Sequence, residues 1–221
     1  MKEDQLNIDE TTLSIDLIDS TEAVKESRFA DALNLLSIIL KEHPDHIDSL
    51  YLAAVSTRYL KKFDDSKKYI DNLMLNAPDM GRAYQELGHL NRDMGNEEKA
   101  VVHYRQACEL NPALLAAWNS LYKYFVKNKN KPAADHALEQ INKLQSLPGV
   151  LLYIDQILNE GRLGLAEAKC RYFLKKNPTH SYAMSLLAEI ANRLGYFDDA
   201  EFLLEKAVEF KPDDGDLRMK Y

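Results

Sequence analysis

Five prolines recur at a nearly fixed interval along this chain of 221 residues. They are Pro44, Pro78, Pro112, Pro178 and Pro212. The first three are 34 residues apart and so are the last two, whereas Pro112 and Pro178 are separated by 66 residues, two fewer than twice the period. A fixed period of this size is typical of a chain that repeats one helical hairpin, in which each hairpin buries its apolar face on its neighbours. The spacing therefore predicts an α-helical solenoid.

The clearest repeat is the segment 81–114, whose small and aromatic residues have different structural roles. Gly88 and Ala100 are expected where two antiparallel helices approach closely, because a larger side chain would push the helices apart. Gly95 ends the first helix at a turn that needs a left-handed backbone, and Pro112 cannot continue the second helix. The segment resembles the tetratricopeptide repeat at nearly every signature position, here Tyr84, Leu87, Gly88, Gly95, Ala100, Tyr104, Ala107 and Pro112.

The same pattern extends over residues 13–214, which is nearly the whole chain. The resemblance implies an all-α fold, a right-handed superhelical α-solenoid of antiparallel helix pairs. It divides the chain into six repeats with the bounds 13–46, 47–80, 81–114, 115–146, 147–180 and 181–214. We expect twelve helices, over residues 14–27, 29–42, 46–60, 63–76, 80–94, 97–110, 114–128, 132–145, 148–160, 163–176, 180–194 and 197–210.

The repeat 115–146 and the two ends of the chain depart from this pattern. The repeat has only 32 residues, and we expect the two missing residues after its second helix, around residues 145–147. Pro132 is expected at the first position of that helix, where a missing N–H costs nothing, and Trp118 is expected to be largely buried. Residues 1–12 form an acidic lead that we expect to be frayed, and residues 215–221 resemble a capping helix or a seventh repeat cut short.

Composition and charge exclude several classes of function. The formal net charge is −7, and the first 22 residues hold seven acids and one lysine. An acidic chain without a basic tract is a poor candidate for general binding to nucleic acids or anionic membranes. Two cysteines, Cys108 and Cys170, lie within helical patterns, and we interpret them as reduced, buried thiols. Because the start has no apolar signal region and no apolar run approaches ~20 residues, we expect a cytoplasmic protein.

No motif for catalysis, a cofactor or a metal was found in the sequence. There is no phosphate-binding loop and no glycine fingerprint for dinucleotides. His43 and His46 flank a proline in a turn with no cysteine nearby, so we expect no metal site there. Asp64-Asp65 and Asp198-Asp199 open second helices, where acids suit the helix dipole. We therefore predict a protein that is not an enzyme and has no cofactor.

The resemblance also implies where a partner binds. In tetratricopeptide arrays the first helices line a concave groove, and ligands usually lie in it. The groove-facing positions of this chain include cations, aromatic residues and amides, with acids at other positions of the same set. As a partner-binding groove we predict Tyr51, Arg58, Tyr59, Arg82, Gln85, His89, Arg92, Asn119, Lys123, Lys127 and Tyr182.

Five of these residues are cations, which favours a protein or peptide ligand with acidic residues. The alternative for this face is an ordinary solvated helical surface. Co-chaperone repeats that bind acidic chaperone tails use a clamp of cations and asparagines. The best window here offers Leu17, Thr21, Leu52, Arg82 and Glu86, which matches one position in five. We therefore do not expect that clamp.

We interpret the chain as a protein–protein interaction scaffold that binds a peptide or partner segment in the concave groove. The alternative, from another class, is the N-terminal arm of a larger enzyme, for example a sulfotransferase-like or glycosyltransferase-like protein, with its catalytic domain beyond residue 221. A third interpretation is weak self-association through the exposed ends of the solenoid, which would appear as a concentration-dependent mass in light scattering.

Overall fold

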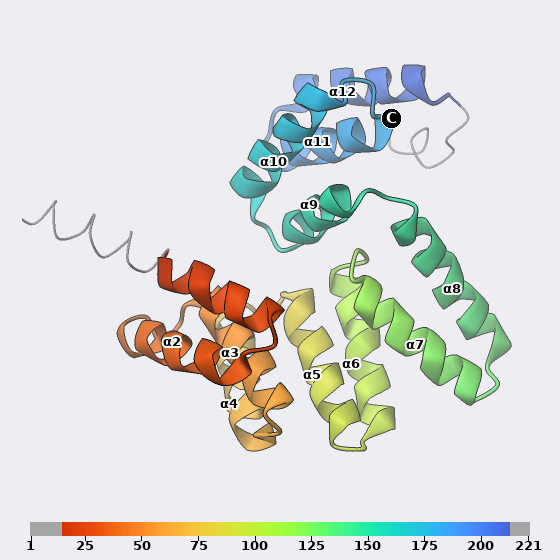
Figure 1. Ribbon diagram of the computed structural model, residues 1–221. Coiled ribbons are helices and arrows are strands. Elements are labelled where there is room, and N and C mark those ends of the chain that lie inside the picture. The colour runs from red at the N-terminus through yellow and green to blue at the C-terminus, as the bar shows by residue number, and fades with distance from the viewer. Residues whose placement is uncertain (1–14, 213–221) are drawn as a thin grey trace, which may run out of the picture. The chain divides into compact units, whose positions relative to one another are not determined.

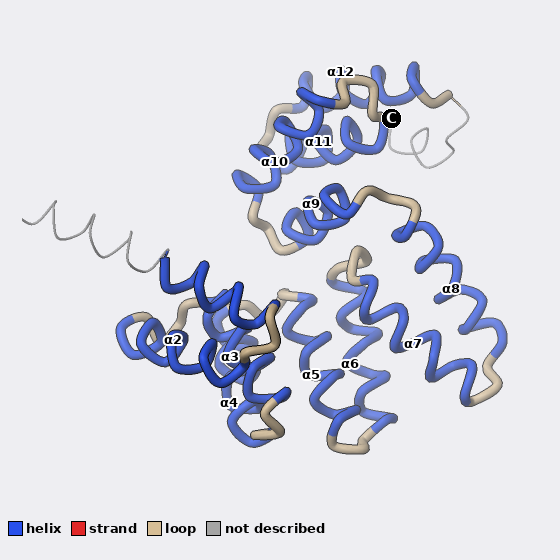
Figure 2. The backbone as a smooth tube through the Cα atoms, in the orientation of Figure 1, coloured by secondary structure: helices blue, strands red, loops and turns tan. Residues whose placement is uncertain are grey.

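The computed structural model describes residues 15–212, and every regular element in that range is a helix (Figures 1 and 2). A helical segment over residues 15–25 comes first. The helices that follow are α2 (Phe29–Glu42), α3 (Ile47–Tyr59), α4 (Phe63–Asn76), α5 (Gly81–Asp93), α6 (Glu97–Leu110), α7 (Leu115–Lys127), α8 (Lys131–Gln145), α9 (Gly149–Asn159), α10 (Leu163–Lys176), α11 (Ser181–Arg193) and α12 (Phe197–Phe210). Each of α2–α12 begins and ends within one residue of its predicted bounds, which confirms the all-α fold. The predictions for residues 1–12 and 215–221 lie outside the described residues.

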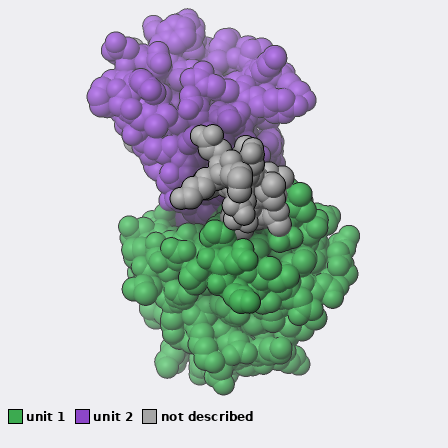
Figure 3. Space-filling model, turned by 90° about the vertical axis from the view of Figure 1, so that its left-hand side faces the viewer, with its two compact units in different colours: residues 1–110, 116–135 green, residues 111–115, 136–221 purple. Residues whose placement is uncertain are grey.

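The chain forms two compact units, coloured separately in Figure 3. Unit 1 contains residues 1–110 and 116–135, and unit 2 contains residues 111–115 and 136–221. Unit 1 therefore holds the helix pairs α3–α4 and α5–α6, and unit 2 holds α9–α10 and α11–α12. None of the described helices is both long enough and apolar enough to cross a membrane.

The two helices of each pair are joined by a short turn that contains one residue with a left-handed backbone. Gly95, Gly161 and Gly195 hold this position with φ of 82°, 75° and 85°, as predicted for Gly95. In the other turns the same position is held by a residue with a side chain, for which a left-handed backbone is strained. These residues are Ser27, Lys61 and Lys129, with φ of 61°, 58° and 55°.

Glycine at these strained positions is expected to stabilise the fold. Lys61→Gly and Lys129→Gly should each raise the free energy of unfolding by about 0.5–1 kcal/mol, because glycine adopts the left-handed backbone without steric cost. Lys68→Gly, an exposed change within α4, is the matched control and should lower it by about 1 kcal/mol. Urea unfolding followed by circular dichroism measures all three. A loss of stability in the two turn variants would contradict the strain argument.

The irregular repeat differs from its prediction in two details. The two missing residues lie in α9, which has 11 residues where α5 has 13, and not in the connection after α8. Pro148 has an extended backbone just before α9, and left-handed Gly161 follows its end, so only a short helix fits between them. Pro132 is the second residue of α8 and not the first, but its missing N–H still falls among the unbonded groups of a first helical turn.

The two helices of the pair α5–α6 pack closely at Gly88. A Cβ atom added to Gly88 would lie 2.6 Å from the Tyr104 ring, so only glycine fits between α5 and that ring, as predicted.

Trp118, predicted to be largely buried, is partly exposed. Both cysteines are free and buried, as predicted, and burial raises the pKa of each thiol to about 12, which leaves it protonated and unreactive.

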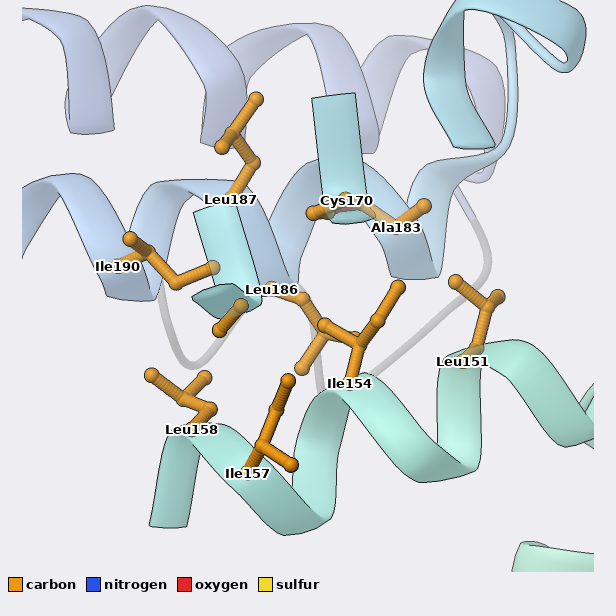
Figure 4. Packing of buried hydrophobic residues seen from close by; sticks show 10 residues of the cluster. Leu151, Ile154, Ile157, Leu158, Cys170, Ala183, Leu186, Leu187 and Ile190 are labelled. Carbon is orange, nitrogen blue, oxygen red and sulfur yellow. The ribbon is translucent and has the colours of Figure 1, made fainter. Parts of the chain in front are cut away.

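The core of unit 2 lies where α9, α10 and α11 meet (Figure 4). Leu151, Ile154 and Leu158 on α9 are fully buried and face Leu186 on α11. Leu187 projects from α11 on the side away from α9. The helix α11 therefore contributes to a core that it shares with both α9 and α10.

Candidate functional site

The predicted groove residues lie on the first helices of the pairs. Unit 1 holds ten of them: Tyr51, Arg58 and Tyr59 on α3, Arg82, Gln85, His89 and Arg92 on α5, and Asn119, Lys123 and Lys127 on α7. Tyr182 is on α11 in unit 2, where its hydroxyl donates a hydrogen bond to Asp155 Oδ2 at 2.6 Å. We therefore describe the site from the residues of unit 1.

Arg58 is buried, although it was predicted to line a groove. Only 5% of its side chain is exposed, and it pairs with Glu86, which is 2% exposed. Its Nη1 donates a second hydrogen bond to Asp93 Oδ2 at 2.8 Å. Burial lowers the pKa of Arg58, but the charge of Glu86 outweighs this and raises the pKa above its ordinary value, so the guanidinium stays charged. Arg58 therefore joins α3 to α5 and is not available to a ligand.

His89 is partly buried and extends this group of polar side chains. Its Nδ1 lies 2.7 Å from the Tyr104 hydroxyl oxygen and 3.4 Å from Arg92 Nη1. Burial, together with the charges of Arg58 and Arg92, lowers the pKa of His89 to about 3. Burial also raises the pKa of Tyr104, which keeps its proton. Because Arg92 Nη1, which can only donate, also faces Nδ1, this nitrogen is assigned as the acceptor and the Tyr104 hydroxyl as its donor.

A pocket of about 220 Å³ brings three of the predicted residues together. Arg92 from α5 and both Lys123 and Lys127 from α7 border it. The pocket is also lined by residues that the sequence analysis missed, some of them on a second helix, which it did not consider for the site. These further residues are Glu97, Ala100, Val101 and Tyr104 on α6 and Ser120 and Tyr124 on α7.

The three cations of this pocket differ in what they already bind. The Arg92 guanidinium donates to Asp93 Oδ1 at 2.8 Å. Lys127 Nζ lies 2.6 Å from Glu97 Oε2 in an exposed pair, which solvent weakens. Lys123 is exposed and forms no ion pair or hydrogen bond with any residue of 15–212. Lys123 is therefore the cation that can bind an anionic ligand without first giving up an existing ion pair.

Other predicted residues lie toward α3. The Arg82 guanidinium is 4.6 Å from the centre of the Tyr51 ring, and its Nη2 is 3.7 Å from Asp48 Oδ1. The Tyr59 ring stacks on Phe29 with centres 4.3 Å apart. Gln85 is buried, and its Oε1 has no hydrogen-bond partner among the residues that the structure describes. Arg82 on α5 and Tyr51 on α3 thus form a second polar cluster, which shares only α5 with the pocket.

His46, one of the two histidines that the sequence analysis considered for a metal, has a structural role. His46 Nδ1 accepts a hydrogen bond from the Ser49 N–H at 3.3 Å and so caps α3. His180 Nδ1 accepts from the Ala183 N–H in the same way and caps α11. Within residues 15–212, no group of three or more histidine, cysteine or acidic side chains could hold a metal ion.

Two family models match the chain, and both describe the tetratricopeptide repeat. One covers residues 81–114 and the other covers residues 158–215. The helix pairs, their turns and the close approach at Gly88 agree with these matches. The chain contains tetratricopeptide repeats.

Solved structures share this fold at low sequence identity. PilF of Pseudomonas aeruginosa is 14% identical over 95% of this chain and 96% of its own, with a TM-score of 0.55. PilW, described as a widely conserved type IV pilus biogenesis factor, is 16% identical over 94% and 97%, with a TM-score of 0.53. A chain of the Naa15/Naa10 complex bound to HypK-THB is 14% identical over 94% of this repeat protein and 38% of its own length, with a TM-score of 0.53. At these identities the likeness is one of fold.

Proposed function

We propose that this repeat protein is a protein-interaction scaffold that binds an acidic segment of a partner across α5, α6 and α7. The observation that carries the proposal is the pocket bordered by Arg92, Lys123 and Lys127. A hollow with cations at its edge holds an anionic group better than a flat exposed surface does, because charges that converge on one point act together.

The walls of the pocket define the ligand further. Ala100, Val101 and the rings of Tyr104 and Tyr124 give it apolar sides. An acidic residue next to an apolar one would therefore place its carboxylate at Lys123 and its apolar neighbour between the rings. Arg82 on α5 and Tyr51 on the neighbouring helix α3 are proposed as a second contact for the segment.

The proposal includes no catalytic step. His89 is neutral and hydrogen-bonded to Tyr104, and Arg58 and Glu86 neutralise each other in the interior. No observation on the described residues favours the alternative of an arm that belongs to a larger enzyme.

Charge reversal tests the proposed site. The probe is a short fluorescein-labelled peptide in which Leu-Asp pairs are separated by Gly-Ser, and its binding is measured by fluorescence anisotropy. Arg82→Glu combined with Lys123→Glu should weaken binding by about 2 kcal/mol, roughly thirtyfold in Kd. Binding to the unchanged protein should also fall as salt rises, because exposed charges are screened.

The matched control is Lys68→Glu combined with Lys99→Glu, which changes the net charge equally at exposed positions of α4 and α6 outside the pocket. The control should lose much less affinity than the pocket variant. Circular dichroism and thermal unfolding establish that both variants keep their helices. An equal loss in the two variants would show that the peptide responds only to net charge, and the proposed site would be wrong.

A further inference from the structure

We propose that unit 2 carries a second, independent binding site, a groove between α10 and α12 that takes a lysine or arginine side chain from a basic segment of a protein partner. The groove is a hollow of about 210 Å³ over α11. Its ligand has the opposite charge to the ligand proposed for unit 1, so either site can fail without the other. The lining residues are Glu167, Arg171, Leu187, Ile190, Ala191, Tyr196, Asp199, Phe202 and Leu203.

The floor of the groove is apolar and fixed. Leu187, Ile190 and Ala191 are buried and come from α11, and Leu187 and Ile190 belong to the core cluster that α11 shares with α9 (Figure 4). Because the core holds α11 in place, this floor is present before a ligand arrives. A preformed apolar floor suits the aliphatic part of a lysine or arginine side chain, which packs on apolar surface while its charge stays near water.

Two exposed aromatic rings stand at the edge of the groove. Tyr196 is 60% exposed and Phe202 is 57% exposed, which is unusual for rings of this size. Lys206 Nζ already lies 5.8 Å from the centre of the Phe202 ring, so this ring attracts a cation from its own helix. A partner's guanidinium or ammonium group would be held by the same cation–π attraction at the side of Phe202 that faces the groove.

The charges around the groove favour a cation. Glu167 is paired with Arg171, whose Nη2 lies 2.9 Å from its Oε1. Asp199 is exposed and forms no ion pair or hydrogen bond with any residue in the described part of the chain. The helix α12 carries five carboxylates and one ammonium group. A cation that approaches the groove is therefore attracted by the net negative charge of α12 and by the Asp199 carboxylate at the edge of the apolar hollow.

The same positions in an earlier pair carry the opposite charges. The pair α5–α6 and the helix α4 precede α11–α12 and α10 by 100 residues. Lys67 and Lys99 there correspond to Glu167 and Asp199, and Val102 corresponds to Phe202. Burial lowers the pKa of His103, and the charges of Lys67 and Lys99 lower it further. The positive charges of both lysines therefore reach the place between α4 and α6 that corresponds to the groove. The acidic and aromatic character thus belongs to α10–α12 and is not a general property of the repeat.

A basic peptide tests the groove. The probe is a short fluorescein-labelled peptide in which Leu-Arg pairs are separated by Gly-Ser, measured by anisotropy on the full chain. Asp199→Lys combined with Phe202→Ala should weaken binding about tenfold, because it removes an ion pair and a cation–π contact. Both side chains are exposed, so the helices and the thermal unfolding temperature should be retained.

The matched control is Glu98→Lys combined with Val102→Ala, which makes the same kind of change on the exposed face of α6. The proposal predicts less than about a twofold loss for the control. A peptide with glutamate in place of arginine should not respond to the Asp199 and Phe202 changes. An equal loss in the control variant, or no loss in the groove variant, would overturn the proposal, and neither result bears on the acidic-peptide site of unit 1.

Discussion

Replacing Arg58 by alanine is expected to lower the free energy of unfolding of unit 1 by about 3–5 kcal/mol. The loss arises from Glu86, whose carboxylate is only 2% exposed and would be left in the interior without the guanidinium that now faces it. Burial already raises the pKa of Glu86, so without Arg58 the carboxylate either stays charged in the interior or takes up a proton, and both cost free energy. Asp93 would suffer less, because Arg92 also donates to it and because it is partly exposed. Urea unfolding followed by circular dichroism measures the change.

Two further variants separate the cost of an unpaired charge from the loss of a large side chain. Arg58→Met combined with Glu86→Met removes both charges at similar volume, and it should recover most of the stability that Arg58→Ala loses. Arg171→Ala breaks an exposed pair with Glu167 and should cost less than about 1 kcal/mol. If Arg58→Ala cost no more than Arg171→Ala, the pair between α3 and α5 would not be a buried one.

The helices could be predicted from the sequence because their ends are set by local chemistry. Pro44, Pro78 and Pro112 stop second helices for lack of an N–H, and Gly95 and Gly195 allow the left-handed turn between helices. These effects depend on the residue itself and not on its neighbours in space. The short α9 was missed because the missing residues were sought at a connection, whereas Pro148 and Gly161 shorten the helix between them.

The site was harder to predict, because it depends on which side chains meet. The family pattern places Arg58 on the groove face but does not reveal that Glu86 and Asp93 would bind it from α5. The pattern also gives no hint that Tyr104 of a second helix would line the same pocket as Lys123 of the next first helix. One signal was available: Arg58 and Asp93 are 35 residues apart, one more than the repeat period, so they occupy matching levels of adjacent first helices.

Acid should destabilise unit 1 through His89. Its pKa is about 3 in the folded protein, against an ordinary value of 6.5, so the unfolded chain binds a proton between these values that the folded chain does not. The stability contributed by the neutral imidazole is present in full above 6.5 and is lost as the pH falls toward 3. The loss approaches about 1.4 kcal/mol per pH unit within this window, or about 2 kcal/mol between neutral pH and roughly pH 4.5.

The variant His89→Gln isolates this contribution, because glutamine keeps an acceptor for the Tyr104 hydroxyl but does not titrate. Urea unfolding near pH 7 and at about pH 4.5 should show that the variant loses about 2 kcal/mol less on acidification than the unchanged protein does. Carboxylates such as Asp93 titrate in both proteins, so their effects cancel in this difference. His43→Gln, at an exposed histidine after α2, is the matched control for removing one histidine. If both variants changed the acid response equally, or if neither did, the neutral, buried state of His89 would be wrong. The hydrogen bond between the two residues would then run from the His89 Nδ1–H to the Tyr104 hydroxyl oxygen.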